Sequence, residues 1–204
     1  ALDGSIYVSD ISPIEYFNGN IKIIKFNSNL SYINEWKSIN IFPPSVGSIF
    51  DIPLGLGINN NGELFSTIVP VEIEADDDIY LSPKIRKFET FPSYSASNDF
   101  GLLGNNPDDT ENPYLAEHGA MYRDIYVDQC GKIFTTKVPN TFAGSDSEAR
   151  NVIVFDSETS SIINNINVEE GTGVLWGLTV DTNGNIYVVD MTNAKILKYK
   201  PVMY

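Results

Sequence analysis

Alternating apolar and polar positions recur along the chain and predict β-strands rather than helices. The clearest example is residues 177–199, GLTVDTNGNIYVVDMTNAKILKY, in which three short runs of apolar and β-branched residues are separated by turns. Asn183 and Gly184 lie between the first two runs, and this dipeptide is the strongest short signal for a hairpin. The stretch therefore predicts three antiparallel strands. A sheet of this size leaves one apolar face bare, so it must pack on another sheet.

The same pattern occurs four times, each time as a turn glycine followed by an alternating strand. The glycines recur at intervals of roughly 50 to 70 residues. A second shared strand follows each of these strands, an apolar strand precedes the last three, and a more polar strand ends three of the repeats. Helical spacing is nowhere sustained. The four glycine-led segments are DGSIYVSD at 3–10, NGELFSTI at 61–68, CGKIFTTK at 130–137 and NGNIYVVD at 183–190.

Four antiparallel strands in a unit of about 50 residues predict the blade of a β-propeller. A parallel solenoid usually has shorter coils without tight hairpins, and the recurring strand order disfavours a β-sandwich. We therefore predict an all-β propeller with about four visible blades, either a single domain or part of a six-bladed ring. The predicted repeats are approximately 1–48, 49–118, 119–172 and 173–204.

The first and last repeats are predicted to be incomplete. GSIYVSD starts the first repeat at its second strand, and KILKYKP ends the last repeat after its third. Unpaired strand edges are a liability, so these strands require neighbours. We expect that the 204 residues do not close a six-bladed ring unaided. An excerpt of a longer propeller is favoured over an irregular blade or strands supplied by a partner chain.

Composition and charge narrow the classes of partner. Hydrophobic residues make up 42% of the chain, which is enough for a packed core. The sequence contains no run of about 18 apolar residues, so we expect no membrane insertion. The net charge of -14 disfavours nucleic acid and anionic lipid surfaces as partners. A single cysteine, Cys130, and a single histidine, His118, exclude an intrachain disulfide and metal sites built from several of these residues.

Two family resemblances are carried by particular segments. Residues 177–199 resemble an NHL-type blade, a pattern also found in the senescence marker protein and gluconolactonase family and in strictosidine synthase-like proteins. Residues 62–70, 82–94 and 122–156 are similar to the yellow and major royal jelly family, in which a strand ending in Val-Asp-x-Cys-Gly leads to a later strand ending in Phe-Asp. These resemblances imply a six-bladed, extracellular propeller that binds small amines or serves as a nutrient or pigment-pathway protein. The chain departs from the insect members by lacking their additional cysteines.

Candidate binding residues are expected where loops converge at the mouth of a propeller channel, on the face where inner strands begin and second strands end. Trp176 and Tyr122 could stack on a ligand or pack between blades. His118 could act as a general base or be an ordinary loop residue. The expected ligand-binding residues are Asp51, His118, Tyr122, Arg123, Trp176 and Lys137.

Several acidic residues and the cysteine have competing interpretations. Asp10 and Asp190 end the strands YVSD and YVVD, where an aspartate either closes its own turn or ligates calcium, the candidate cofactor. Asp128 and Asp181 lie at the opposite strand ends and are expected to form turns. Cys130 is expected to be an exposed or half-buried thiol without catalytic surroundings.

No catalytic signature is found in the sequence. A GxSxG elbow, a Walker loop and a dinucleotide fingerprint are all missing from it. The main hypothesis is therefore a secreted, non-catalytic propeller that binds a small molecule, a glycan or a protein at the channel mouth. The alternatives are a metal-dependent lactonase or esterase of the gluconolactonase type and a structural or scaffold module.

Overall fold

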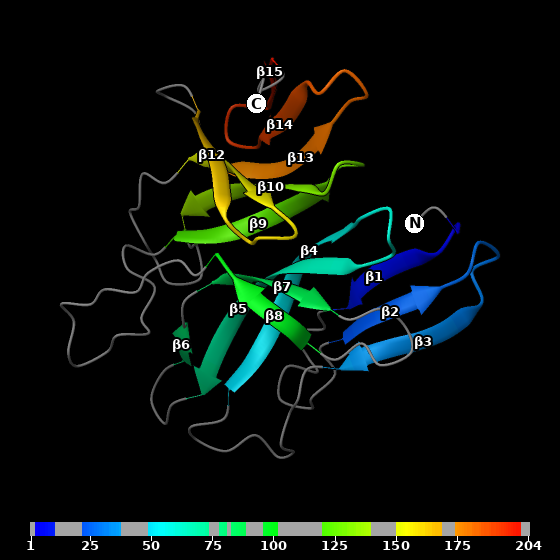
Figure 1. The fold of residues 1–204 in the computed structure, drawn as a ribbon. Helices are drawn as coiled ribbons and strands as arrows, with labels where there is room; N and C mark the ends of the chain where they lie inside the picture. Colours follow the sequence, from blue (N-terminus) through cyan, green and yellow to red (C-terminus); the bar gives the residue numbers. More distant parts are fainter. Residues whose placement is uncertain are drawn as a thin grey trace.

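A computed structural model of the chain contains four antiparallel β-sheets in the residues that it describes (Figure 1). The described residues are 3–10, 22–37, 49–73, 78–80, 83–88, 96–101, 120–139, 150–168 and 174–200. The first sheet contains β1 (Ile6–Asp10), β2 (Lys22–Phe26) and β3 (Tyr32–Lys37). The second contains β4 (Ile49–Ile58), β5 (Leu64–Ile73), β7 (Lys84–Phe88) and β8 (Ala96–Phe100), with β6 (Asp78–Tyr80) paired to β5.

The third and fourth sheets follow the same order along the chain. The third contains β9 (Ala120–Val127), β10 (Lys132–Pro139), β11 (Asn151–Asp156) and β12 (Ile162–Asn167). The fourth contains β13 (Leu175–Val180), β14 (Ile186–Asp190) and β15 (Lys195–Tyr199). Each sheet lies within one of the four repeats expected from the sequence. In the described residues no helix is long and apolar enough to cross a membrane.

Turn glycines and aspartates precede the second strands of the third and fourth sheets. Gly131 and Gly184 have φ of +79° and +78°, a conformation that side chains with a Cβ rarely adopt. Asp128 Oδ1 accepts hydrogen bonds from the backbone N–H groups of Cys130 and Lys132, both at 2.8 Å. Asp181 forms the corresponding pair in the fourth sheet. The prediction that these two aspartates form turns is confirmed.

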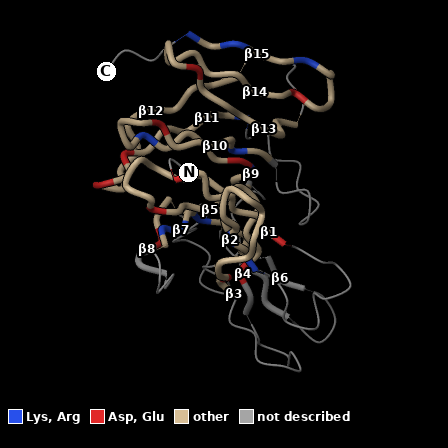
Figure 2. The backbone as a smooth tube through the Cα atoms, turned by 90° about the vertical axis from the view of Figure 1, so that its right-hand side faces the viewer, with Lys and Arg blue, Asp and Glu red and all other residues tan. Residues whose placement is uncertain are grey.

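Neighbouring sheets pack face to face in chain order, with β4 against β9 and β9 against β13 (Figures 1 and 2). Two apolar cores fill the spaces on either side of the third sheet. One contains Phe65 and Ile133 between the second and third sheets, and the other contains Phe134 and Ile186 between the third and fourth. Sequential blades packed through their faces, with consecutive strands antiparallel, define a β-propeller. The predicted fold class is thus confirmed.

The first and last sheets lie at opposite ends of this row (Figure 1). In the described residues each has three strands, because no strand precedes β1 within its sheet and none follows β15. The first sheet packs on the second through β1 and β4, and the described strands of the first and last sheets make no extensive contact with each other. The expectation that these two blades are incomplete stays a prediction.

Candidate functional site

The first strands of the second, third and fourth sheets, here called inner strands, each carry a β-bulge at the same place. In the pairs β4–β5, β9–β10 and β13–β14, the register shifts so that two inner-strand residues lie opposite one residue of the second strand. A bulge bends the strand and redirects side chains, which is why bulges are frequent beside functional sites. The bulges are Leu54-Gly55 opposite Thr67, Arg123-Asp124 opposite Thr136, and Trp176-Gly177 opposite Val189.

Buried hydroxyl groups hold the bulge of the second sheet in place. Thr67 Oγ1 accepts a hydrogen bond of 2.8 Å from the Gly55 N–H, and Ser66 Oγ donates one of 2.9 Å to the Gly55 carbonyl. An added Cβ at Gly55 would lie 2.9 Å from the backbone of Asp124, so glycine permits β4 to approach β9 closely. The bulge therefore also sets the spacing of the two inner strands.

The third sheet repeats these hydroxyl contacts, and the fourth replaces the hydroxyl residues. Thr136 Oγ1 accepts from the Asp124 N–H at 3.2 Å, and Thr135 Oγ1 donates to the Asp124 carbonyl at 2.7 Å. The corresponding positions of β14 are Val188 and Val189, which have no hydroxyl. The fourth bulge must therefore be held by other contacts.

The Asp124 carboxylate provides one of those contacts by joining the third and fourth sheets. Its Oδ2 accepts a hydrogen bond of 2.8 Å from the Leu178 N–H, and its Oδ1 accepts one of 2.9 Å from the Ile125 N–H. Ile125 and Leu178 each follow the bulge of their strand, so one side chain satisfies equivalent amides in adjacent blades. Burial raises the pKa of Asp124, although both hydrogen bonds act in the opposite direction.

Arg123 and Trp176, the first residues of two adjacent bulges, stack on each other. The guanidinium carbon lies 3.6 Å from the centre of the indole ring, which is close for a cation–π contact. Burial lowers the pKa of Arg123, and no carboxylate forms an ion pair with it among the described residues. Trp176 remains 45% exposed. The stacked pair thus presents a half-buried cation and an accessible aromatic surface.

The other expected residues near this pair face elsewhere or cannot be placed. Tyr122 is buried against Phe155, with ring centres 6.0 Å apart, and burial raises the pKa of its phenol. The ring packs between blades, which is one of the two alternatives expected from the sequence. Lys137 lies opposite Tyr122 in the strand register and shares its face rather than that of Arg123. His118 lies outside the described residues.

Asp51 belongs to a charge network that the sequence did not reveal. Its carboxylate pairs with the Arg86 guanidinium, and it lies 3.9 Å from Lys84 Nζ. Asp99 completes the network with bonds of 2.7 and 2.8 Å to Arg86 and 2.8 Å to Lys84. Burial opposes both charges, but the hydrogen bonds raise the pKa of Arg86 and lower that of Asp99. The only sequence signal was the alternation of basic and apolar residues in PKIRKF.

The two aspartates considered for calcium lie in different end sheets. Asp10 Oδ2 is 3.8 Å from Lys22 Nζ. Asp190 is buried and accepts hydrogen bonds from the Asn193 backbone at 3.1 Å and side chain at 2.7 Å, as a turn-closing aspartate does. Within the described ranges, no group of three or more Asp, Glu, His or Cys residues is placed to hold a metal. Cys130 is exposed.

No family model matches the sequence, and no curated protein matches it. Similar solved structures include a gluconolactonase from Xanthomonas campestris, with 14% identity and a TM-score of 0.47 over 92% of this chain and 51% of that one. A streptogramin B lyase has 13% identity and a TM-score of 0.41 over 92% and 50%. U3-55K has 13% identity and a TM-score of 0.41 over 98% and 50%.

The chain spans about half the length of these three structures. Likenesses of 13–14% identity concern the fold, and residues are not equated between such chains. The candidate site, the Arg123–Trp176 pair with its Asp124 support, rests on the contacts within this chain.

Proposed function

We propose that this β-propeller binds a small molecule at the Arg123–Trp176 pair and performs no chemistry on it. The observation that carries the proposal is the guanidinium stacked 3.6 Å from the centre of an accessible indole ring, without a carboxylate partner in the described residues. Acidic residues outnumber basic ones by 27 to 13 in this chain, so an arginine without an acidic partner stands out. A ligand can supply the missing negative charge.

The chemistry of the pair favours an anionic ligand with a planar or apolar part. A guanidinium binds a carboxylate through two parallel hydrogen bonds, and the indole offers apolar surface beside it. The family resemblance implies a cationic amine as ligand. Such an amine on the Trp176 ring would be repelled by the positive charge of Arg123, which stacks on the same ring. Small carboxylates are therefore the ligands of first choice, ahead of amines, glycans or a protein surface.

A screen with matched variants tests the proposal. Aromatic and aliphatic carboxylates are tested by thermal shift, and the hits are measured by calorimetry. Arg123→Gln and Trp176→Ala should each weaken binding at least about tenfold, a loss of about 1.4 kcal/mol. Arg123→Lys should be intermediate, because it keeps the charge but loses the planar fork. Thr179→Ala, an exposed change on the same strand, is the control.

Two results would refute this proposal. One is the absence of any saturable carboxylate binding, and the other is equal loss of binding in the Thr179→Ala control. Turnover of a bound ligand by the purified protein would contradict the non-catalytic part. The extracellular location and the relation to the yellow and major royal jelly family are proposals of the same kind, supported by the sequence resemblance.

A metal-dependent hydrolase of the gluconolactonase type is the second candidate, favoured by the NHL-type pattern of residues 177–199. Such an enzyme needs acidic and amide oxygens around a divalent ion. The described residues hold no such acidic group, so its ligands would have to include other parts of the polypeptide. Stoichiometric calcium or zinc by elemental analysis, together with metal-dependent lactone hydrolysis, would favour this candidate over the binder.

A further inference from the structure

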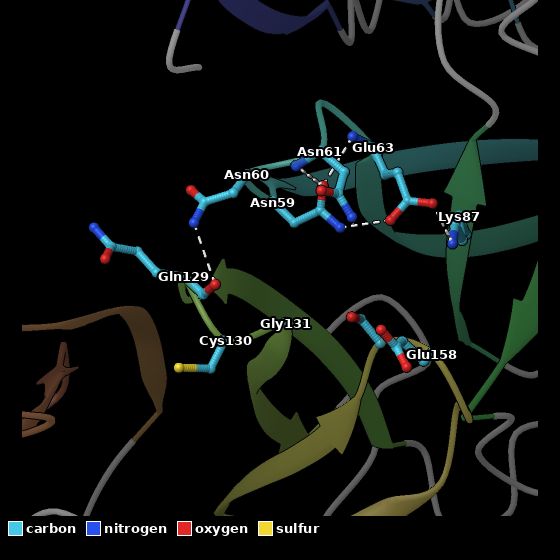
Figure 3. Close-up of a pocket in the computed structure, with 10 residues that line it drawn as sticks. Asn59, Asn60, Asn61, Glu63, Lys87, Gln129, Cys130, Gly131 and Glu158 are labelled. Carbon is cyan, nitrogen blue, oxygen red and sulfur yellow. Dashed lines mark hydrogen bonds and ion pairs between the residues drawn. The ribbon is translucent and has the colours of Figure 1, made fainter.

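A polar hollow of about 260 Å³ lies between the second and third sheets (Figure 3). It is formed by the β4–β5 turn at 59–63, the β9–β10 turn at 129–131, the turn after β11 at 157–158, and Lys87. These turns occupy the strand ends opposite those at which Asp51 and Lys137 lie. We call this hollow the turn pocket. It is separate from the Arg123–Trp176 pair.

The walls of the turn pocket are fixed by their own hydrogen bonds. Asn59 Oδ1 accepts bonds of 3.0 and 2.9 Å from the backbone N–H groups of Asn61 and Glu63. Asn60 Nδ2 donates a bond of 3.2 Å to the Gln129 carbonyl, which ties the turns of adjacent blades together (Figure 3). A preformed pocket loses little conformational entropy when a ligand enters.

Several polar groups of the pocket are left without partners. Ser157 is only 6% exposed as a residue, and it lines the pocket. No hydrogen bond of its hydroxyl is found among the described residues, and the hydroxyl oxygen is not fully buried. A hydroxyl that can be reached from the pocket and has no protein partner can donate to or accept from a ligand atom. The side-chain amides of Asn61 and Gln129 and the carboxylate of Glu158 also border the pocket.

The charges and the side chains that line the pocket disfavour anionic ligands and apolar ligands. Glu63 and Lys87 neutralise each other at 2.6 Å, which leaves Glu158 as the uncompensated charge in the lining. In a protein of net charge -14, this arrangement repels anions. No aromatic or aliphatic side chain lines the hollow, so an apolar ligand would find no matching surface.

We propose that the turn pocket binds a neutral, hydroxyl-rich molecule of monosaccharide size. Hydroxyl groups both donate and accept hydrogen bonds, as do the serine and amide groups that border the pocket. The volume of about 260 Å³ lies just below the usual range for drug-sized ligands, about 300 to 1,000 Å³, and suits one sugar ring. This proposal does not depend on the function assigned to the mouth.

Cys130 provides a single reporter for the test, because it borders the pocket, is exposed and is the only cysteine of the chain. Its reaction with Ellman's reagent is followed in the presence of glucose, mannose or N-acetylglucosamine. At a sugar concentration about three times the Kd, occupancy should slow the reaction about fourfold. Saturation-transfer NMR with the same sugars measures binding independently. Sodium acetate and ethanolamine serve as charged comparisons.

Matched variants locate the binding. Ser157→Ala and Asn61→Ala should each weaken sugar binding about fivefold, the loss expected for one hydrogen bond. Asn183→Ala changes the equivalent turn position in the fourth sheet, outside the pocket, and should leave binding unchanged. If Ser157→Ala fails to fold, Asn61→Ala at an exposed position carries the test.

Three results would overturn the proposal. The first is no saturable signal and no protection of Cys130 by any of the sugars. The second is equal weakening by Asn61→Ala and Asn183→Ala. The third is protection by acetate or ethanolamine but not by sugars, which would assign the pocket to a charged ligand.

Discussion

Apolar residues at equivalent positions are buried where two sheets pack together and exposed on the sheets at the two ends of the row. The second residue after each turn glycine faces the preceding sheet, and it is 2%, 0% and 0% exposed at Leu64, Ile133 and Ile186. Ile6 has the same place in the first sheet but is 41% exposed. The side chains are alike, so the difference is the presence or absence of a sheet on that face. Burial in this fold comes from the neighbouring blade.

The last sheet shows the same difference on its opposite face. The residue opposite each bulge faces the following sheet, where Thr67 and Thr136 are fully buried but Val189 is 40% exposed. Ile6 and Val189 thus lie on blade faces equivalent to the buried interfaces, but no sheet of the described part of the chain packs on them. We propose that further blades of the same kind cover both faces and continue the ring. Covering exposed apolar surface contributes a favourable free energy of about 25 cal/mol per Å² removed from water.

The strongest test of this comparison is the same substitution at an inner and an outer position. Ile133→Ala should lower the free energy of unfolding by about 2 to 5 kcal/mol, because it leaves a cavity between two sheets. Ile6→Ala should change it by no more than about 0.5 kcal/mol. Urea unfolding of both variants measures the difference. A similar loss at the two positions in this chain would contradict the comparison.

Removing a charged side chain should also cost more stability in the second sheet than in the first. Arg86→Met should destabilise the fold by about 2 to 3 kcal/mol, below the value for a fully buried pair because Asp99 is partly exposed. Lys22→Met removes the more distant contacts to Asp10 and Glu35, at 3.8 and 3.7 Å, and should cost less than about 1 kcal/mol. Thermal unfolding at low and high salt measures both, and equal losses would count against the network.

The repeating fold could be predicted because its signals are local. Turn glycines such as Gly62 and Gly131 precede alternating strands, and both have the positive φ that makes glycine favourable there. Asp128 and Asp181 follow from the same turn chemistry. These features depend on a few consecutive residues, so no knowledge of neighbouring sheets is required.

The site was only partly predictable because it depends on bulges and on contacts between strands. Arg123 and Trp176 were expected near the mouth, but their stacking results from two bulges that no residue pattern marks. Asp124, which joins two sheets, was missed for the same reason. Asp51 was expected to face a ligand, whereas Arg86, distant in sequence, brings it into an ion-pair network. Its partner could be identified only from the β4–β5–β7 pairing.

The contact between the third and fourth sheets should depend on pH through Asp124. Because burial raises its pKa in the folded state, its contribution to stability is fully present below its unfolded pKa of about 3.9 and is lost as pH rises through the folded value. Asp124→Asn removes this titration and should cost about 1 to 2 kcal/mol, since one amide loses an acceptor. The deficit should be larger at acidic than at neutral pH.

Asp99 serves as a control, because its contribution to stability should depend on pH in the opposite direction. Its folded pKa is lowered by Arg86 and Lys84, so its contribution is present above the unfolded pKa and is lost as pH falls through the folded value. The deficit of Asp99→Asn should therefore shrink as the medium becomes acidic. Urea unfolding across the acidic range, with both variants against the parent chain, gives the two trends. Parallel trends would refute the assignment of Asp124.

The smallest effect is expected when the threonine hydroxyl of the second and third sheets is introduced at the equivalent position of the fourth sheet. Thr67 and Thr136 accept the N–H of the second bulge residue in their sheets, whereas Val189 has no hydroxyl for the equivalent Gly177. Val189→Thr keeps the β-branched shape and adds that acceptor, so it should stabilise the fold by about 0.5 to 1 kcal/mol. Slower amide exchange at Gly177 would show that the bond forms. Unchanged exchange and stability would mean that the fourth bulge differs from the other two.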